Sequence, residues 1–159
     1  MFLKPDYNLK SIYDINLEEL EKSGIKAMLF DLDSTLMASK SGKYSEEMLE
    51  WLDKVKSKFF VAVVSNNKNE KYIEKVKKVS DFPLLFNAAK PDIKNVKKFI
   101  EKYNLTEKDC VLVGDRPLTD ILCGKRLGCK TILVDSITAD SEAKIVRFVR
   151  KLERLSIRK

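Results

Sequence analysis

Short apolar runs alternate along the chain with polar stretches that have helical spacing. The apolar runs are residues 27–30, 59–64, 84–86, 110–113 and 131–134. The helices are predicted over residues 45–57, 69–79, 91–103, 118–127 and 141–155. This alternation is typical of parallel strands joined by crossover helices. We therefore expect an α/β fold, a Rossmann-like three-layer domain with a mostly parallel five-stranded sheet.

A chain of 159 residues fits one domain. We expect that domain to cover residues 1–159, with a catalytic core over about 26–135 and a terminal helix over about 141–155. The longest apolar run, 59–64, has six residues and is too short to span a bilayer. The first residues carry several carboxylates and no long apolar stretch, which argues against a secretory signal.

The cysteine and histidine content limits the kinds of site and of catalysis that this chain can support. Cys110, Cys123 and Cys129 have no CxxC spacing, so neither a disulfide framework nor a zinc site is indicated. We expect reduced, buried thiols in a cytoplasmic protein. The chain has no histidine, which excludes the Ser-His-Asp and Cys-His nucleophile systems. An enzyme built on this chain must use carboxylates, lysine and hard metal ions.

Asp31 and Asp33 follow the first apolar run in the sequence DLDST. Two carboxylates at an active edge can divide labour, one as nucleophile and metal ligand and the other as general acid and base. A pair of capping or turn aspartates is an equally good interpretation of this motif by itself.

Ser65 and Asn66 follow the second run, where their hydroxyl and amide could hold phosphate oxygens. An ordinary cap for the helix predicted from residue 69 is the simpler interpretation. Lys90 precedes Pro91, which suits a first helical position and keeps the lysine extended, with its ammonium aimed at the edge of the sheet. The alternative is a surface lysine.

The fourth run ends in GDRPLTD, which contains Asp115 and Asp120. Asp120 could be a carboxylate in a first helical turn, but Asp115, directly after a buried strand and Gly114, is harder to explain structurally. Carboxylates from Asp31 and Asp115, a carbonyl and retained waters would suit Mg²⁺.

The four motifs are far more specific together than apart, because each follows a successive predicted strand. In parallel sheets such residues meet beyond the carboxyl ends of the strands. Together they supply a nucleophile, an acid and base, a metal site and positive charge, which are the parts that phosphoryl transfer needs.

In DLDST, Ser65, Lys90 and GDRPLTD, the chain resembles the haloacid dehalogenase (HAD) phosphatase superfamily over about residues 26–135. The resemblance implies an HAD-like fold and Mg²⁺-dependent phosphomonoester hydrolysis through an aspartyl-phosphate intermediate. It also implies that Asp31 is the nucleophile and a metal ligand, and that Asp33 is the general acid/base and binds the metal through its backbone carbonyl. Ser65 and Lys90 would bind the phosphoryl group, Thr35 would support the loop, and Thr35 and Asn66 would contribute to substrate binding. Asp115 would be a metal ligand, and Asp120 would support the metal directly or through water.

The chain has no room for a cap domain between Asp33 and residue 45 or between Ser65 and Lys90. An open site favours bulky substrates such as lipids. The segments FLKPDY, SIYDI, VVSNN and GDRPLTDI further resemble the YqeG family of type IIIA HAD phosphatases, whose relatives include phosphatidylglycerophosphate phosphatases. Ser34 and Met37 depart from that pattern, where asparagine and an aliphatic residue are expected.

Other functions stay open at this point. The same chemistry could act on a small sugar or nucleotide phosphate. A receiver-type phospho-acceptor also uses aspartates, a hydroxyl and a lysine, but its acid pair precedes the acceptor by a strand and a helix, unlike DLDST. An RNA-binding protein would leave the acidic constellation unexplained and lacks a stacking platform, so no nucleic-acid partner is expected.

The net charge is +7, and the C-terminal segment carries nearly all of it. Residues 144–159 hold seven basic residues and one acidic residue, which leaves 24 basic and 23 acidic residues elsewhere. Apolar residues recur in this segment at helical spacing: Ile145, Phe148, Val149, Leu152 and Leu155. The pattern predicts a basic amphipathic helix. It either packs on the sheet or also attaches the enzyme peripherally to the inner face of an anionic membrane.

Overall fold

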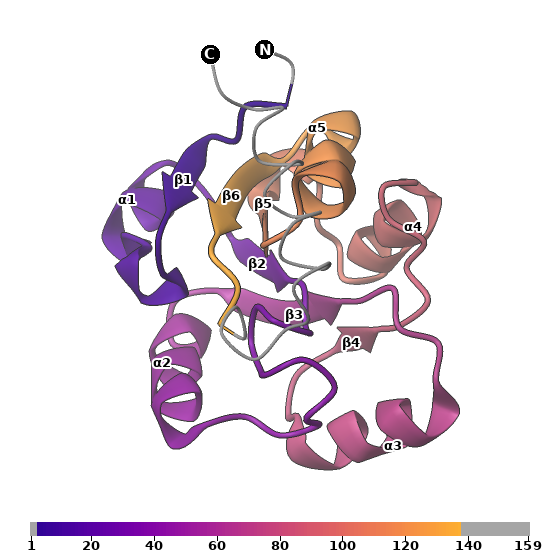
Figure 1. Cartoon of the computed structure of the whole chain (residues 1–159). Coiled ribbons are helices and arrows are strands. Elements are labelled where there is room, and N and C mark those ends of the chain that lie inside the picture. Colours follow the sequence, from indigo (N-terminus) through magenta and orange to yellow (C-terminus); the bar gives the residue numbers. More distant parts are fainter. Residues whose placement is uncertain (1–2, 138–159) are drawn as a thin grey trace.

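Six parallel strands form one sheet with helices on both faces in the computed structural model, which describes residues 3–137 (Figure 1). The strand order is β1-β6-β5-β2-β3-β4. The strands are Tyr7–Leu9 (β1), Ala27–Phe30 (β2), Phe60–Val64 (β3), Leu84–Leu85 (β4), Cys110–Gly114 (β5) and Lys130–Val134 (β6). The predicted α/β fold with a parallel sheet is confirmed, and the sheet has six strands rather than five.

The additional strand is β1, which adds to the edge of the sheet beside β6. It has only three residues, one of them exposed, so it forms no apolar run that a sequence pattern can detect. Long-range contacts place it: the Asp6 carboxylate accepts hydrogen bonds from the Thr131 backbone N–H at 2.8 Å and from its hydroxyl at 3.2 Å. The strand thus depends on its partner rather than on local propensity.

Between residues 3 and 137, five helices and three short helical turns connect the strands. The helices are Leu17–Lys22 (α1), Glu46–Lys56 (α2), Glu70–Val79 (α3), Lys94–Lys102 (α4) and Leu122–Leu127 (α5). The turns are Ile12–Asp14, Glu107–Asp109 and the π-helical turn Pro117–Ile121. The helices predicted over 45–57 and 69–79 are confirmed as α2 and α3, and the side chains of Ser45 and Asn69 cap their first turns.

Two predicted helices begin elsewhere. The helix predicted from residue 91 begins at Lys94, so Pro91 is not at its first position. The peptide bond between Lys90 and Pro91 is cis. Residues 89–92 form a turn that is closed by a hydrogen bond from Asp92 N to Ala89 O at 2.9 Å. The helix predicted from residue 118 is a π-helical turn first and becomes α5 only at Leu122. The helix predicted over 141–155 lies outside the described residues.

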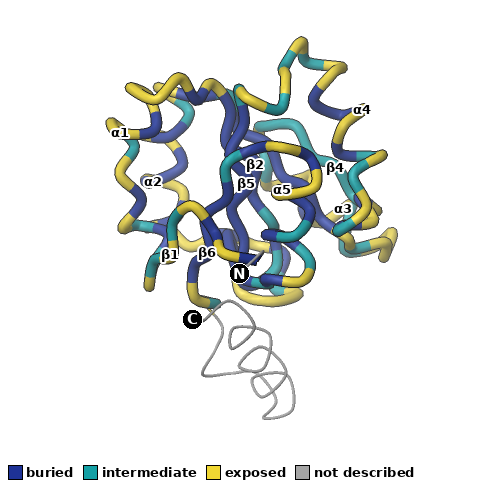
Figure 2. The backbone as a smooth tube through the Cα atoms, turned by 90° about the horizontal axis from the view of Figure 1, so that it is seen from above, coloured by how far each residue is buried: buried dark blue, intermediate teal, exposed yellow. Residues whose placement is uncertain are grey.

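The two faces of the sheet bury separate apolar clusters because side chains alternate along each strand. From β2, Met28 and Phe30 pack on the face that α1, α2 and α3 cover, where Phe30 meets Trp51 edge to face at 5.7 Å. Ala27 and Leu29 pack on the opposite face, under α4 and α5. Figure 2 shows the buried central strands between helices with exposed outer surfaces. The sheet is therefore the middle layer between two layers of helices.

Within residues 3–137 no inserted domain covers the carboxyl edge of the sheet, as predicted. Cys110, Cys123 and Cys129 are buried and unbridged, also as predicted. In the part of the chain that the structure describes, no helix is long and apolar enough to cross a membrane.

Candidate active site

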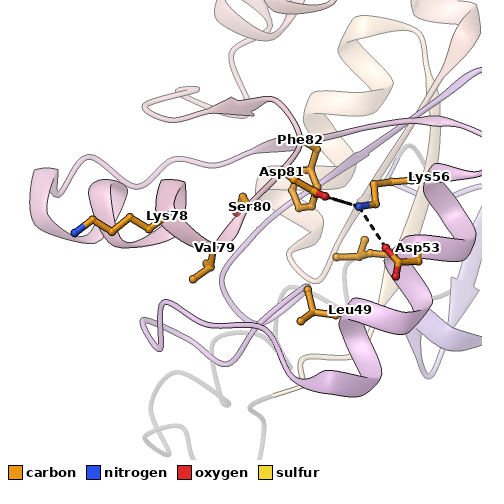
Figure 3. Close-up of a pocket in the computed structure, with 9 residues that line it drawn as sticks. Leu49, Asp53, Lys56, Lys78, Val79, Ser80, Asp81 and Phe82 are labelled. Carbon is orange, nitrogen blue, oxygen red and sulfur yellow. Dashed lines mark hydrogen bonds and ion pairs between the residues drawn. The ribbon is translucent and has the colours of Figure 1, made fainter.

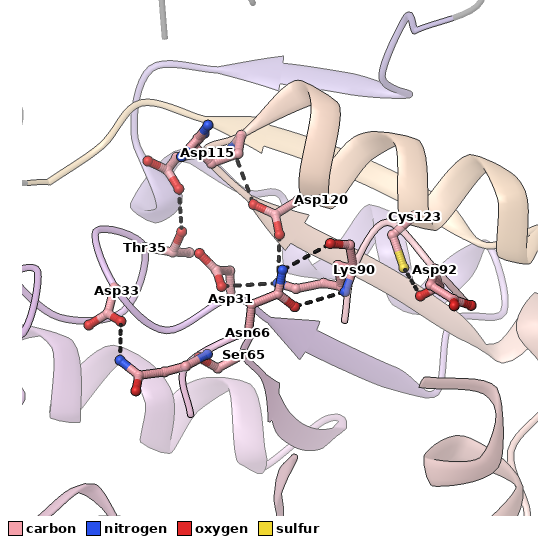
Figure 4. Close-up of polar contacts among 12 residues, drawn as sticks. Asp31, Asp33, Thr35, Ser65, Asn66, Lys90, Asp92, Asp115, Asp120 and Cys123 are labelled. Atoms are coloured by element: carbon pink, nitrogen blue, oxygen red, sulfur yellow. Dashed lines mark hydrogen bonds and ion pairs between the residues drawn. The ribbon is translucent and has the colours of Figure 1, made fainter. Parts of the chain in front are cut away.

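The four sequence motifs meet beyond the carboxyl ends of β2, β3, β4 and β5 (Figure 4). They surround an open hollow of about 320 Å³. Its lining residues are Asp31, Asp33, Ser65, Asn66, Asn67, Lys90, Asp115, Arg116 and Thr119. The convergence expected from strand order is thus observed, although contact with substrate or metal stays a prediction for each residue.

Lys90 joins two of the carboxylates at the centre of the site. Its Nζ lies 3.0 Å from Oδ1 of Asp31 and 2.7 Å from Oδ1 of Asp120. The side chains of Lys90 and Asp120 are 1% and 0% exposed, whereas that of Asp31 keeps 16%. Lys90 is therefore not a surface lysine, and Asp31 is the member of this trio that a ligand in the hollow can reach.

The surroundings of Asp31 and Lys90 alter their protonation. Burial and the negative charge of Asp120 raise the pKa of Asp31 to about 6, although Lys90 acts in the opposite direction. Burial alone would lower the pKa of Lys90, but the charges of Asp120 and Asp31 outweigh it and hold that pKa above its ordinary value. Lys90 thus carries a fixed positive charge inside the site.

Asp31, Asp115 and Asp120 form an acidic triad, in which one carboxylate oxygen from each residue lies within 4.8 Å of the other two. Asp115 is buried at the end of β5, and the Thr35 hydroxyl donates to its Oδ1 at 3.4 Å. Thr35 is itself buried, and its side chain contacts the triad through this hydrogen bond to Asp115. A cluster of hard oxygen donors with excess negative charge fits Mg²⁺, which would offset that charge.

Gly114 and the π-helical turn bring Asp120 into the triad. An added Cβ on Gly114 would lie 2.1 Å from Oδ2 of Asp120, so only glycine leaves space for this carboxylate. The same Oδ2 accepts a hydrogen bond from Arg116 N at 3.2 Å. Asp120 is therefore held inside the site rather than placed as a helix-dipole carboxylate, and π-helical turns often occur at functional sites.

Ser65 and Asn66 do not cap α3, because Asn69 does. Asn66 instead holds the backbone of Lys90: its Nδ2 donates to Lys90 O at 2.9 Å, and its Oδ1 accepts from Lys90 N at 2.8 Å. Ser65 is buried at the end of β3, and its Oγ accepts from Asn67 N at 3.1 Å. The direct contact of Asn66 with substrate stays a prediction, while its support of Lys90 is a structural finding.

The Asp33 carboxylate accepts hydrogen bonds that the sequence motifs did not indicate. Its Oδ1 accepts from the backbone of Lys40 at 3.0 Å, and its Oδ2 accepts from Asn67 Nδ2 at 3.4 Å. The hydroxyl of Tyr72, on α3, also donates to Oδ1. Tyr72 lies 39 residues from Asp33, and no spacing rule links them. Only the fold reveals this contact.

The loop that carries Asp33 explains one departure from the family pattern. Ser34 has φ of 69°, a left-handed conformation that asparagine tolerates better than most other residues. An asparagine is therefore a natural residue at this position, and serine adopts the same turn here.

A second hollow, of about 370 Å³, lies between α2 and the end of α3 (Figure 3). Its charged groups are largely paired, since Lys56 Nζ lies 2.9 Å from Asp81 and 3.4 Å from Asp53. Leu49, Val79 and Phe82 supply apolar lining. It contains none of the four motifs, so the carboxyl-edge hollow is the candidate active site.

The amino-acid sequence is similar to those of known and probable phosphatases. A family model described as mitochondrial PGP phosphatase matches residues 1–138. The probable phosphatase YqeG of Bacillus subtilis is 33% identical over 153 residues, which are 96% of this chain and 88% of that protein. The phosphatidylglycerophosphate phosphatase 1 of Arabidopsis thaliana chloroplasts and mitochondria is 28% identical, and the match covers 96% of this chain and 46% of that protein.

Among solved structures, an uncharacterized protein from Listeria monocytogenes serotype 4b is similar with a TM-score of 0.58. The sequences are 17% identical, and the match covers 80% of this chain and 99% of that one. At this identity the likeness concerns the fold, and it supports the parallel α/β architecture described above.

Proposed function

Since this chain belongs to the YqeG/mitochondrial PGP phosphatase family and is an HAD-type phosphatase, we propose that it hydrolyses a lipid phosphomonoester of the phosphatidylglycerophosphate type through an aspartyl phosphate on Asp31. The observation that carries the mechanism is the position of Lys90 between Asp31 and Asp120 at the open hollow. A partly exposed carboxylate beside a fixed ammonium can attack an anionic phosphoryl group that the ammonium has attracted.

In the first step, an oxygen of Asp31 forms a bond to phosphorus, and the bond from phosphorus to the leaving oxygen breaks. Asp33 gives its proton to that oxygen, so the product leaves as an alcohol. Lys90 Nζ, with the Ser65 hydroxyl, offsets the charge on the phosphoryl oxygens.

In the second step, water attacks the phosphorus of the aspartyl phosphate. Asp33, now a carboxylate, takes a proton from that water, and the bond between phosphorus and Asp31 breaks to release inorganic phosphate. One carboxyl group thus serves as acid and then as base.

Asp31, Asp115 and the backbone carbonyl of Asp33 would hold Mg²⁺, with Asp120 supporting the site directly or through water. When bound, the ion supplies positive charge next to the phosphoryl oxygens and orients them. The acidic triad and its oxygen-only donor set support this assignment.

A lipid phosphate is the proposed substrate for two reasons. The family description and the name of the Arabidopsis relative both refer to phosphatidylglycerophosphate. In addition, no inserted domain closes the hollow within residues 3–137, so a headgroup that projects from a bilayer has access to Asp31.

Residues 144–159 are proposed to hold the enzyme at an anionic membrane surface, because their seven basic residues can each contribute on the order of 1 kcal/mol near such a surface. Charge reversal leaves the apolar stripe intact when it is made at Arg150, Lys151, Arg154 and Arg158. It should lower binding to anionic vesicles at low salt and turnover of vesicle-borne substrate, while sparing a small soluble phosphoester. Equal loss of both activities would contradict the membrane role.

The function is tested by assaying purified protein with Mg²⁺ on phosphatidylglycerophosphate in mixed micelles, on sugar phosphates and on nucleotides. The proposal predicts the highest kcat/KM for the lipid. A sugar or nucleotide phosphate hydrolysed with higher kcat/KM would refute the lipid assignment and keep the phosphatase chemistry.

A further inference from the structure

Both carboxylate oxygens of Asp33 accept hydrogen bonds from groups outside the Lys90–Asp31 pair. Three donors from three segments meet this carboxylate: the backbone N–H of Lys40, the amide of Asn67 and the hydroxyl of Tyr72. Of these, Tyr72 is the only side chain that lies on a helix. It therefore links Asp33 to a packed element of the fold.

Tyr72 is itself well fixed. Its backbone N–H donates to the cap residue Asn69 at 2.9 Å, and its ring packs against the apolar cluster beneath α2 and α3. Its hydroxyl also lies 3.3 Å from Sδ of Met37. Asp33 and Met37 form a bridge across the active-site loop, so one phenol touches both sides of that loop.

We propose that Tyr72 is a positioning residue that holds the Asp33 carboxyl group where proton transfer to the leaving oxygen and from water can occur. The inference rests on the proposed acid and base role of Asp33. Proton transfer requires hydrogen-bond distance between the carboxyl group and the reacting oxygen, and a carboxyl group that rotates freely spends less time in that geometry. In this role Tyr72 acts through Asp33 and does not need to contact the substrate.

The alternative is that Tyr72 merely packs against the core, and leaving-group dependence separates the two. An alkyl phosphate needs a proton on its leaving oxygen, whereas p-nitrophenyl phosphate does not. In Tyr72→Phe the ring stays and the hydroxyl is lost. We expect kcat/KM on an alkyl phosphate, which reports the step that releases the leaving group and not the later hydrolysis of the aspartyl phosphate, to fall about tenfold, with a smaller loss on p-nitrophenyl phosphate.

The matched control is Tyr7→Phe, which removes another hydroxyl that donates to a carboxylate, at 2.8 Å from Glu19 and away from the site. It should leave both rates unchanged. The ratio of kcat/KM on the alkyl phosphate to kcat/KM on the aryl phosphate is independent of the fraction of protein that folds. A packing defect in Tyr72→Phe would therefore change both rates equally and leave the ratio at its wild-type value.

A double variant completes the test. If Tyr72 acts through Asp33, Tyr72→Phe should slow the Asp33→Asn enzyme no further. An unchanged alkyl-to-aryl ratio in Tyr72→Phe, or a full additional loss in the double variant, would overturn the inference while Asp33 keeps its role. Wild-type turnover by Asp33→Asn would instead refute the proposed acid and base step, and this inference with it.

Discussion

The Cα of Gly114 faces the carboxylate of Asp120 so closely that an added Cβ would lie 2.1 Å from Oδ2 and 2.3 Å from Cγ. Asp120 cannot yield easily, because Lys90 and the backbone of Arg116 hold its two oxygens. Gly114→Ala should therefore displace Asp120, destabilise the fold by about 1–3 kcal/mol and greatly lower turnover. Thermal unfolding and steady-state rates measure both effects.

Gly24→Ala is the control for this prediction. Gly24 has φ of 93° and no heavy atom near its added Cβ, so alanine there costs about 1–2 kcal/mol of backbone strain without a clash. It precedes β2, at the opposite edge of the sheet from the hollow. Turnover by the folded Gly24→Ala enzyme should equal that of wild type. Full turnover by Gly114→Ala would show that Asp120 is dispensable or can move.

Lys90→Met should be destabilising because it leaves Asp31 and Asp120 together without their shared ammonium. Removal of one partner from a buried ion pair costs roughly 3–5 kcal/mol. Lys56→Met removes a lysine that pairs with the exposed Asp53 and Asp81, and should cost only about 0–1 kcal/mol. Urea unfolding of both variants compares them. Equal losses of stability would contradict the buried pairing at Lys90.

The sequence predicted the fold where the signal is local. Runs such as 110–113 are apolar throughout because both faces of their strands are buried, and strand order then brings the four motifs to one edge. The strand β1 was missed because three residues with mixed exposure carry no pattern, and its placement depends on Asp6 and Thr131.

Contacts between side chains distant in sequence account for the rest of the site. The Asn66 amide was expected at the substrate, and the structure shows both its polar atoms on the Lys90 backbone. Tyr72 carries no motif, and its link to Asp33 appears only once α3 packs beside the active-site loop. Spacing rules describe residues on one element, whereas these contacts join separate elements.

Asp115→Asn should weaken Mg²⁺ binding at least about tenfold, because a magnesium site with few protein ligands depends strongly on each carboxylate. Mg²⁺ should raise the unfolding temperature of wild type, and this shift should shrink in the variant. Asp53→Asn, which alters an exposed carboxylate on α2, should keep the full shift. A wild-type shift in Asp115→Asn would exclude Asp115 as a ligand, and activity in excess EDTA would exclude a metal-assisted mechanism.

Asp33→Asn should let p-nitrophenyl phosphate phosphorylate the enzyme but slow hydrolysis of the aspartyl phosphate about 100-fold or more, because water loses its base. Acid-quenched protein should then carry a phosphoryl group that hydroxylamine removes. The wild-type enzyme should carry much less. Unslowed turnover by Asp33→Asn would remove Asp33 from the mechanism.

The most direct test of the mechanism is to locate that phosphoryl group. Asp33→Asn protein is mixed with p-nitrophenyl phosphate and Mg²⁺, quenched in acid, digested and sequenced by mass spectrometry. The account predicts one phosphorylated residue, Asp31, and neither phosphoenzyme nor turnover in an otherwise matched protein with Asp31→Asn, because an amide cannot attack phosphorus. A phosphoryl group on another residue, or turnover by folded Asp31→Asn protein, would contradict the assignment of Asp31 as the nucleophile.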